Sequence, residues 1–315
     1  ALKRTCENLH DALTLAEDGD TIVVAAGTYE EVLYISRDIT LTGANRGISG
    51  SSHERGPETA IRGDIIIGPD AESVVIDGFA ITGSITTALK ARARQRFVLQ
   101  NSVVDGRGAR AAISLMKGAS GTIADNVIMG GADEAIYVPY GFRDLVITTN
   151  CIRAATGSAA IVLGGGPGVD RVHVLGNTIT GGDYGVFIEV SNGLAQPGDA
   201  IHIAGNTFGE RDPCAGRPPV VACVYADDLV PAPLRASLGT SLALNSYLVS
   251  APAVAQDVMF DEAPGDELSE SGVMRVLCQG TGDSGETAAN DRTDETEQPA
   301  FEPDQPRKMR AGSAE

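Results

Sequence analysis

The sequence contains no tryptophan, and aromatic residues make up only 4% of its 315 residues. It has no apolar stretch long enough to cross a membrane, and no signal peptide is recognisable at its start. Basic residues are also scarce, because 24 Lys and Arg stand against 42 Asp and Glu, which gives a formal net charge of −18. A charge of this sign excludes nucleic acid as a partner and disfavours anionic polysaccharides, unless a local basic patch or bound cations intervene.

Cysteine is too scarce for a disulfide framework, since the chain has five. Cys6 and Cys151 are expected to be small buried hydrophobes, the first on the apolar face of a helix and the second in a strand. Cys214 and Cys223 are close enough in sequence to close a loop disulfide or, equally, to stay reduced. In the first case Cys278 is left unpaired.

What the chain does have is a repeated phrase with a period of roughly 25 residues, the range of solenoids. The segments FVLQNSV, TIADNVI, VITTNCI, HVLGNTI and HIAGNTF align on Asn101, Asn126, Asn150, Asn177 and Asn206. One such copy cannot bury its apolar face alone, but stacked copies can. We therefore predict parallel strands, one above another, with these five asparagines in a structural ladder whose amides hydrogen-bond along the stack.

Apolar rows flank the aligned asparagines and are predicted to face a common interior, because side chains alternate across a strand. The row three residues before the Asn is Val98, Ile123, Ile147, Val174 and Ile203. The row two residues after it is Val103, Ile128, Ile152, Ile179 and Phe208. An earlier coil fits the same frame with Phe79 in the Asn position. Each coil also contains a second predicted strand, at 113–115, 136–138, 161–163 and 186–188.

The predicted organisation is one solenoid domain over residues 1–255 followed by a tail. A capping helix covers residues 5–17, with Thr5 as its N-cap and Gly19 as its stop. Clear coils occupy about 20–210, and residues 211–255 form an irregular region in which 220–225 and 242–249 either complete coils or pack beside them. Residues 256–315 are acidic and polar, which predicts a largely disordered tail.

Two segments near the start carry a family resemblance. AEDGDTIVVAAGTYEE at 16–31 and DITLTGAN at 38–45 resemble the opening of right-handed parallel β-helix proteins. This is the pectin-lyase-like superfamily, which includes pectin methylesterases, NosD-like periplasmic proteins and secreted bacterial β-helix proteins. The resemblance implies an all-β, right-handed parallel β-helix over roughly residues 5–210 and a secreted or periplasmic location. It leaves the activity open, because this fold hosts lyases, hydrolases, esterases, epimerases and non-enzymatic surface proteins.

One coil carries a loop rich in aromatic and charged residues. Tyr137 and Tyr140 offer flat apolar faces beside charged groups, a combination that suits a sugar ring. In a lyase or epimerase, Arg143 would serve as base or clamp, with Asp133 and Glu134 as the other catalytic candidates. The alternative is that Tyr137 packs against a loop. The catalytic sets of pectin methylesterases and the calcium cluster of pectate lyases have no clear counterpart in the sequence.

A second coil supplies further candidates for substrate binding. Asp183, Tyr184 and Glu189 belong to a strand and its corner two coils beyond Asp133. Two coils separate Asp133 from Asp183 by roughly 10 Å, too far to share one Ca²⁺ ion directly. Ca²⁺ is the one cofactor left open.

His173 and His202 each lie four residues before a ladder Asn, so they should point outward on adjacent coils, with Phe97, Thr122 and Val146 in the same row. Two histidines without a third ligand predict no metal site, but they are candidates for substrate contact. A basic stretch, Lys90–Arg96 with Arg107 and Arg110, either contacts uronate carboxylates or is a solvated loop.

Three functions follow from these observations. The first is an exported β-helix protein that binds carbohydrate or a surface partner. The second is a polysaccharide lyase or epimerase that acts on a uronate-containing glycan, and the third is a structural or adhesin scaffold. The sequence indicates no oligomeric state.

Overall fold

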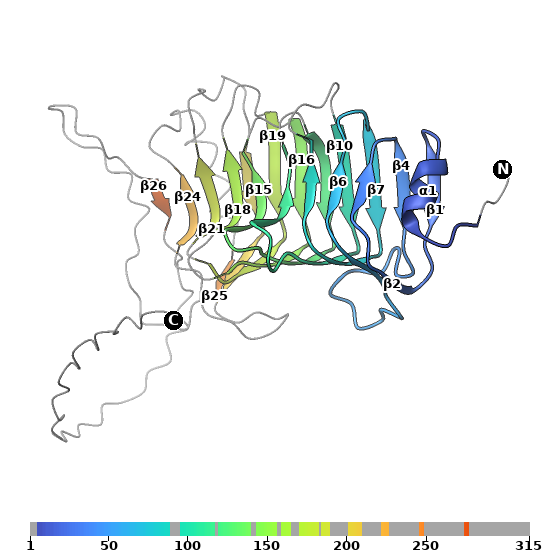
Figure 1. Ribbon diagram of the computed structural model, residues 1–315. Helices are drawn as coiled ribbons and strands as arrows, with labels where there is room; N and C mark the ends of the chain where they lie inside the picture. Colours follow the sequence, from blue (N-terminus) through green and yellow to red (C-terminus); the bar gives the residue numbers. More distant parts are fainter. Residues whose placement is uncertain are drawn as a thin grey trace, which may run out of the picture. The chain divides into compact units, whose positions relative to one another are not determined.

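The computed structural model describes residues 5–88, 95–116, 119–139, 143–155, 159–164, 170–182, 184–189 and 201–209, with the strand segments 222–226, 246–248 and 274–276. Within these ranges the chain winds into successive coils, and each coil adds a strand to each of three sheets. The strands stack in chain order, beginning beside helix α1 (Leu9–Leu15) at the N-terminal end (Figure 1). The protein is thus the all-β parallel solenoid that the repeats predict.

The sheets are named A, B and C in the order in which each coil visits them. Sheet A contains β1 (Asp20–Val23), β4 (Ile39–Thr42), β7 (Ser73–Asp77), β10 (Gln95–Gln100), β13 (Ala119–Ala124), β16 (Arg143–Thr148), β19 (Asp170–Leu175) and β22 (Ile201–Ala204). Sheet B contains β2 (Gly27–Tyr29), β5 (Thr59–Arg62), β8 (Ala80–Thr82), β11 (Val103–Asp105), β14 (Val127–Met129), β17 (Cys151–Arg153), β20 (Thr178–Thr180), β23 (Thr207–Gly209) and β25 (Ser246–Leu248). Sheet C contains β3 (Leu33–Ile35), β6 (Ile65–Ile67), β9 (Ile85–Thr87), β12 (Ala111–Ser114), β15 (Glu134–Val138), β18 (Ala159–Gly164), β21 (Tyr184–Glu189), β24 (Ala222–Ala226) and β26 (Met274–Val276).

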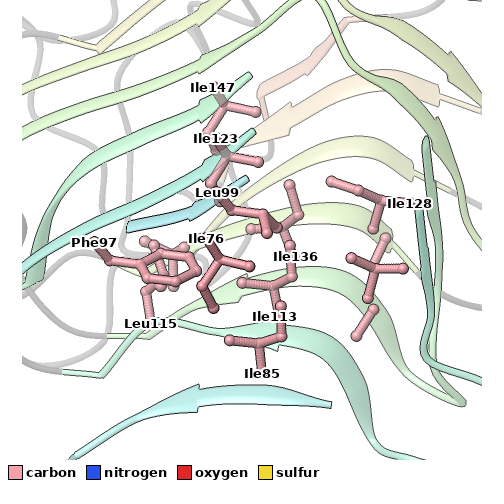
Figure 2. Packing of buried hydrophobic residues seen from close by; sticks show 14 of the residues in the cluster. Ile76, Ile85, Phe97, Leu99, Ile113, Leu115, Ile123, Ile128, Ile136 and Ile147 are labelled. Atoms are coloured by element: carbon pink, nitrogen blue, oxygen red, sulfur yellow. The ribbon is translucent and has the colours of Figure 1, made fainter. Parts of the chain in front are cut away.

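Columns of aliphatic side chains fill the interior between the sheets. In sheet A the register brings Ile76, Leu99, Ile123 and Ile147 into one column, and all four side chains are fully buried. In sheet C a second column is formed in the same way by Ile85, Ile113 and Ile136. Figure 2 shows these columns facing one another across the core. Parallel pairing in register therefore buries the same apolar position of every coil, as the alternation predicts.

The asparagine ladder is present from Asn126 to Asn206. The Nδ2 of Asn126 donates to the Oδ1 of Asn150, Asn150 donates to Asn177, and Asn177 donates to Asn206, each at 2.9 Å. Each amide also reaches a backbone carbonyl of the preceding coil, as Asn150 does to Ile123 at 2.8 Å. These side chains are at most 2% exposed. The ladder thus satisfies buried backbone groups where sheet A turns into sheet B.

Asn101 is not a member of this ladder, contrary to the prediction. The register pairs Leu99 with Ile123, so Ser102 is the residue that lies over Asn126, and its N–H donates to the Asn126 Oδ1 at 2.9 Å. Asn101 itself adopts a left-handed conformation with φ 53° and donates to Asp77 at 2.8 Å. Asparagine suits both positions, because it tolerates positive φ and also bonds backbone at turns. In this coil the position equivalent to the ladder asparagines is therefore Ser102, one residue after the predicted Asn101.

The same one-residue difference between predicted and observed register changes the position of three other residues of that coil. Leu99 and Val104 take the interior positions predicted for Val98 and Val103. Phe97, predicted on the outer surface in the row of the histidines, is 1% exposed and belongs to the core cluster. Val98 occupies the outer row in its place. A strand shifted by one residue exchanges its two faces, which explains all three differences.

The coil of Phe79 closes the same corner without an amide. Phe79 is fully buried in the column of Ser102, as predicted, and its N–H donates to the Ser102 Oγ at 3.2 Å. A loop over residues 44–58, called here the Arg55 loop, lies against this corner. Arg55 donates to the carbonyl of Asn101 at 2.7 Å and pairs with Glu58 at 2.8 Å. The loop thus supplies backbone partners that the ladder supplies farther along.

Helix α1 begins later than predicted. Its N-cap is Asn8 rather than Thr5, because the Asn8 side chain accepts the N–H of Asp11 at 2.7 Å. The carboxylate of Glu31 also accepts the N–H groups of Leu9 and His10 at the start of the helix. Leu9 is buried in the same cluster as the sheet residues, so the helix covers the N-terminal end of the core as expected.

Three strands extend the sheets beyond residue 209. β24 pairs in parallel with β21, and β25 pairs in parallel with β23, so the segments predicted at 220–225 and 242–249 each add a strand to a sheet. β26 pairs antiparallel with β24, although it lies past the predicted boundary at residue 255. The chain divides into units Ala1–Thr281 and Gly282–Glu315, and the second lies outside the described residues, as does the rest of the predicted tail.

Candidate functional site

The outer face of sheet C carries one side chain from each of seven successive strands. Register pairing aligns them, and each alternates with buried neighbours that point into the core. We call this row the sheet C column: Tyr34, Ile66, Thr86, Ser114, Tyr137, Val162 and Phe187. Its rungs lie about 4.8 Å apart, the distance between paired strands. No member of the column is charged, although charged residues make up 21% of the chain.

Tyr137 is the centre of the best-formed polar cluster on this face. The guanidinium carbon of Arg110 lies over the Tyr137 ring, 4.9 Å from its centroid. The Nε of Arg110 is 3.0 Å from the Oδ2 of Asp133, and its Nη2 is 3.7 Å from the Oε1 of Glu134. We call these four residues the Tyr137 cluster. It places a half-buried aromatic ring beside charged donors and acceptors, as the sequence predicts for this coil.

The two carboxylates shape the electrostatics of Arg110. The negative charge of Glu134 is the largest cause that raises the pKa of Arg110, followed on the raising side by Tyr137 and Asp133. Glu134 is 9% exposed, whereas the side chains of Arg110 and Asp133 are mostly exposed. The guanidinium is therefore held over the ring by acids of its own chain.

A second aromatic pair lies farther along sheet C. The rings of Tyr184 and Phe187 meet edge to face, with their centroids 5.4 Å apart. Tyr184 is in register with Ala159 and, through it, with Glu134, whereas Phe187 is in register with Val162 and Tyr137. Two strand spacings, roughly 10 Å, therefore separate Tyr137 from Phe187 along the column. The rings of Tyr137 and Phe187 are both half-buried and keep an accessible part.

The predicted catalytic residues occupy two different corners of their coil. Asp133 and Glu134 stand where β15 of sheet C begins, whereas Arg143 begins β16 of sheet A after β15 has ended. The backbone of Arg143 pairs with Asp170, and its side chain lies outside the described part of the structure. Arg110, which comes from the preceding coil, meets Asp133 and Glu134. Their catalytic role stays a prediction.

Three substrate-binding candidates cannot be placed further. Tyr140 and Asp183 lie outside the described residues. Glu189 is described only by its backbone, which pairs with Gly164 at the end of β18. Of the basic stretch, residues 90–94 also lie outside the described ranges.

The position of Arg110 in the sequence indicates its place beside Asp133, although its basic neighbours alone do not. Arg110 directly precedes β12, just as Asp133 directly precedes the next strand of sheet C, β15. Corners at equivalent positions of adjacent coils are neighbours in a solenoid. Aligning the second strands instead of the asparagines would have placed these two residues beside each other.

His173 and His202 are paired on the outer face of sheet A, as predicted. Their rings stack with centroids 5.1 Å apart and planes 7° from parallel. Burial is the largest cause that lowers the pKa of His173, and the charges of His202 and Arg171 lower it further, while Asp144 raises it. Arg171 is itself paired with Asp144. Across the described residues, no three His, Cys, Asp or Glu side chains gather closely enough to hold a metal ion.

Cys151 differs from its prediction as a small hydrophobe, because it is disulfide-bonded. It lies in β17 of sheet B and is 7% exposed. Its partner falls outside the described residues, and so does the predicted Cys214–Cys223 pair as far as side chains are concerned. Cys6 is a free thiol and half-buried.

The three parallel sheets, the stacked aliphatic core and the amide ladder define a parallel β-solenoid. Residues 58–208 match the family model described as the right handed beta helix region. No curated protein and no solved structure matches the chain. In the portion that the structure describes, no helix is long and apolar enough to cross a membrane.

Proposed function

We propose that this chain is an exported β-helix protein that binds carbohydrate through the outer face of sheet C. The observation that supports this most is the Tyr137 cluster, in which Arg110 lies over the Tyr137 ring and meets Asp133 at 3.0 Å. A sugar ring presents an apolar face to an aromatic side chain and hydroxyl groups to charged ones. The cluster offers both across two adjacent coils, and Phe187 adds a second ring two coils beyond Tyr137.

The disulfide of Cys151 supports the exported location. Disulfides form and persist in oxidising compartments and are rare in the cytosol of mesophiles. Cys151 is disulfide-bonded, whereas Cys6 is a free thiol. Peptide mapping by mass spectrometry, without reduction and after thiol blocking in the cell, should find Cys151 in a cross-linked peptide. Recovery of Cys151 as a blocked free thiol would remove this support.

Binding is best tested by calorimetry against a panel of neutral and anionic oligosaccharides. Tyr137→Ala should raise the Kd of a bound glycan about tenfold, because losing an aromatic contact costs about 1–1.5 kcal/mol. Tyr34→Ala is the matched control, since Tyr34 is a member of the same column, 55% exposed and outside the Tyr137 cluster. It should leave the Kd unchanged.

Two results would contradict the proposal. One is the absence of binding to every glycan, which would favour a surface protein partner or a scaffold. The other is an equal loss in the Tyr137→Ala and Tyr34→Ala variants. Ultraviolet absorbance of unsaturated sugar products should stay flat during incubation with uronate polymers, and a rise would establish a lyase instead.

A further inference from the structure

The charges around Tyr137 bear on which kind of glycan this face accepts. Arg110 carries a formal charge of +1 and Asp133 and Glu134 one of −1 each, so the four residues of the Tyr137 cluster have a formal charge of +1 − 2 = −1. Its neighbours within the sheet C column, Ser114 and Val162, are uncharged.

Among the residues that the structure describes, Arg110 lies over the Tyr137 ring, and it already forms an ion pair with Asp133. Its Nε donates to Asp133 at 3.0 Å, and its Nη2 lies 3.7 Å from Glu134, so two of its three nitrogens face acids of the protein. A uronate carboxylate that approaches Arg110 over Tyr137 would therefore lie near both of these acids. Like charges at such distances oppose binding.

The column itself suits a chain of uncharged pyranose rings. From Ser114 to Phe187 its members are uncharged: Ser114, Tyr137 and Phe187 keep accessible surface, and Val162 between the two rings is 6% exposed. The rungs repeat about every 4.8 Å, a spacing comparable with the length of one sugar residue in an extended glycan. Tyr137 and Phe187, two rungs apart, can then stack on alternate rings of one chain.

We infer that the part of the sheet C column from Ser114 to Phe187 binds a neutral glycan and discriminates against uronate-containing polymers, with Asp133 and Glu134 as the residues that determine this specificity. The inference rests on the proposed carbohydrate binding at the same face. Here the two carboxylates act in recognition. Both orient Arg110 over Tyr137 and repel acidic sugars, and the mostly exposed Asp133 also accepts hydrogen bonds from sugar hydroxyls.

The test compares a neutral oligosaccharide with an oligogalacturonate of equal length, each titrated into the full chain by calorimetry at two salt concentrations. The wild type should bind the neutral ligand at least tenfold more tightly, with a Kd that salt does not change. The double variant Asp133→Asn/Glu134→Gln frees the guanidinium of Arg110. It should gain at least tenfold in affinity for the oligogalacturonate, and added salt should weaken that binding.

The control removes a carboxylate from a comparable exposed pair elsewhere. Glu30 pairs with Arg62 at 3.2 Å near the N-terminal end, with both side chains more than half exposed. Glu30→Gln should leave both affinities unchanged, which separates a local effect from a change of net charge. Tighter binding of the oligogalacturonate by the wild type, or no gain in the double variant, would overturn the specificity inference while carbohydrate binding stands. No binding of either ligand or of any glycan would overturn both.

Discussion

The corner between sheets A and B is closed in two different ways along one solenoid. From Asn126 to Asn206 each coil presents an amide that bonds the next amide and a carbonyl of the coil before. In the coil of Phe79 the same position holds a buried ring, and Arg55 reaches over the corner from a loop. The requirement is common to both regions, because buried backbone groups need partners. A repeated residue meets it in one region and a single long-range contact meets it in the other.

The largest effect is expected from breaking the ladder at its centre with Asn150→Leu. Asn150 takes part in hydrogen bonds with Ile123, Asn126 and Asn177, and leucine leaves their buried groups without partners. The loss should be at least about 4 kcal/mol, since each unsatisfied buried group costs about 1–3 kcal/mol. Urea denaturation measures it. Asn101→Gly, at an asparagine outside the ladder, should cost no more than about 1 kcal/mol. If Asn150→Leu and Asn101→Gly lose equal stability, the ladder hydrogen bonds do not stabilise the protein more than other contacts of the turn.

The closure by a ring should fail in a different way. Phe79→Ala leaves a cavity where the side chain was fully buried, and should destabilise the protein by about 3–5 kcal/mol. Phe79→Leu should recover most of this loss, because here the corner depends on volume rather than on amide hydrogen bonds. Equilibrium unfolding of both variants measures the difference. If both variants unfold like the wild type, the ring does not support this corner.

The residue before each ladder position allows a stabilising change. This position is left-handed in successive coils, with Gly78, Asn101, Asp125, Thr149, Gly176 and Gly205 at φ between 53° and 82°. Thr149 is the β-branched member and the least suited to positive φ. Thr149→Gly should raise the free energy of unfolding by roughly 0.5–1 kcal/mol. It removes a left-handed strain of about 1–2 kcal/mol, but glycine loses more conformational entropy on folding, which offsets part of this gain. Asp125→Gly should gain less, and a loss in the Thr149 variant would argue against strain.

The smallest effect concerns the stacked histidines. The pKa of His173 is lowered in the folded state, so the unfolded chain binds more protons as the pH falls below the ordinary value of 6.5. The stability from the neutral imidazole is present above that value and is lost as the pH falls through the window toward the lowered pKa. His202, Arg171 and Asp144 are the other groups that act on this ring. His173→Gln should flatten the fall of melting temperature with pH, and an unchanged slope would contradict this.

The repeats predicted the coils well where one residue type has one role. The second strands of each coil and the ladder from Asn126 onward are in the predicted register, because their buried positions recur at the same place in successive coils. The prediction failed at Asn101, where asparagine fits two neighbouring positions of the turn. The two positions differ in backbone conformation, which the amino-acid sequence does not state.

The Tyr137 cluster was predicted in part. Tyr137, Asp133 and Glu134 are adjacent in sequence, and composition alone suggested a polar surface beside an aromatic ring. Arg110 comes from the preceding coil, so its place over the ring depends on how the coils are aligned. Arg143 is nearer to Tyr137 in sequence but begins another sheet, which sequence distance did not reveal.

The sequence by itself determined the architecture, because a regular alternation of apolar side chains can be buried only by stacking coil on coil. Tertiary structure decided which residues meet at each corner: Ser102 rather than Asn101 lies over Asn126, and Arg110 of the preceding coil lies beside Asp133. The physical reason is register. A shift of one residue costs little locally but exchanges the two faces of a strand, and only the packing of all the coils together selects one alignment.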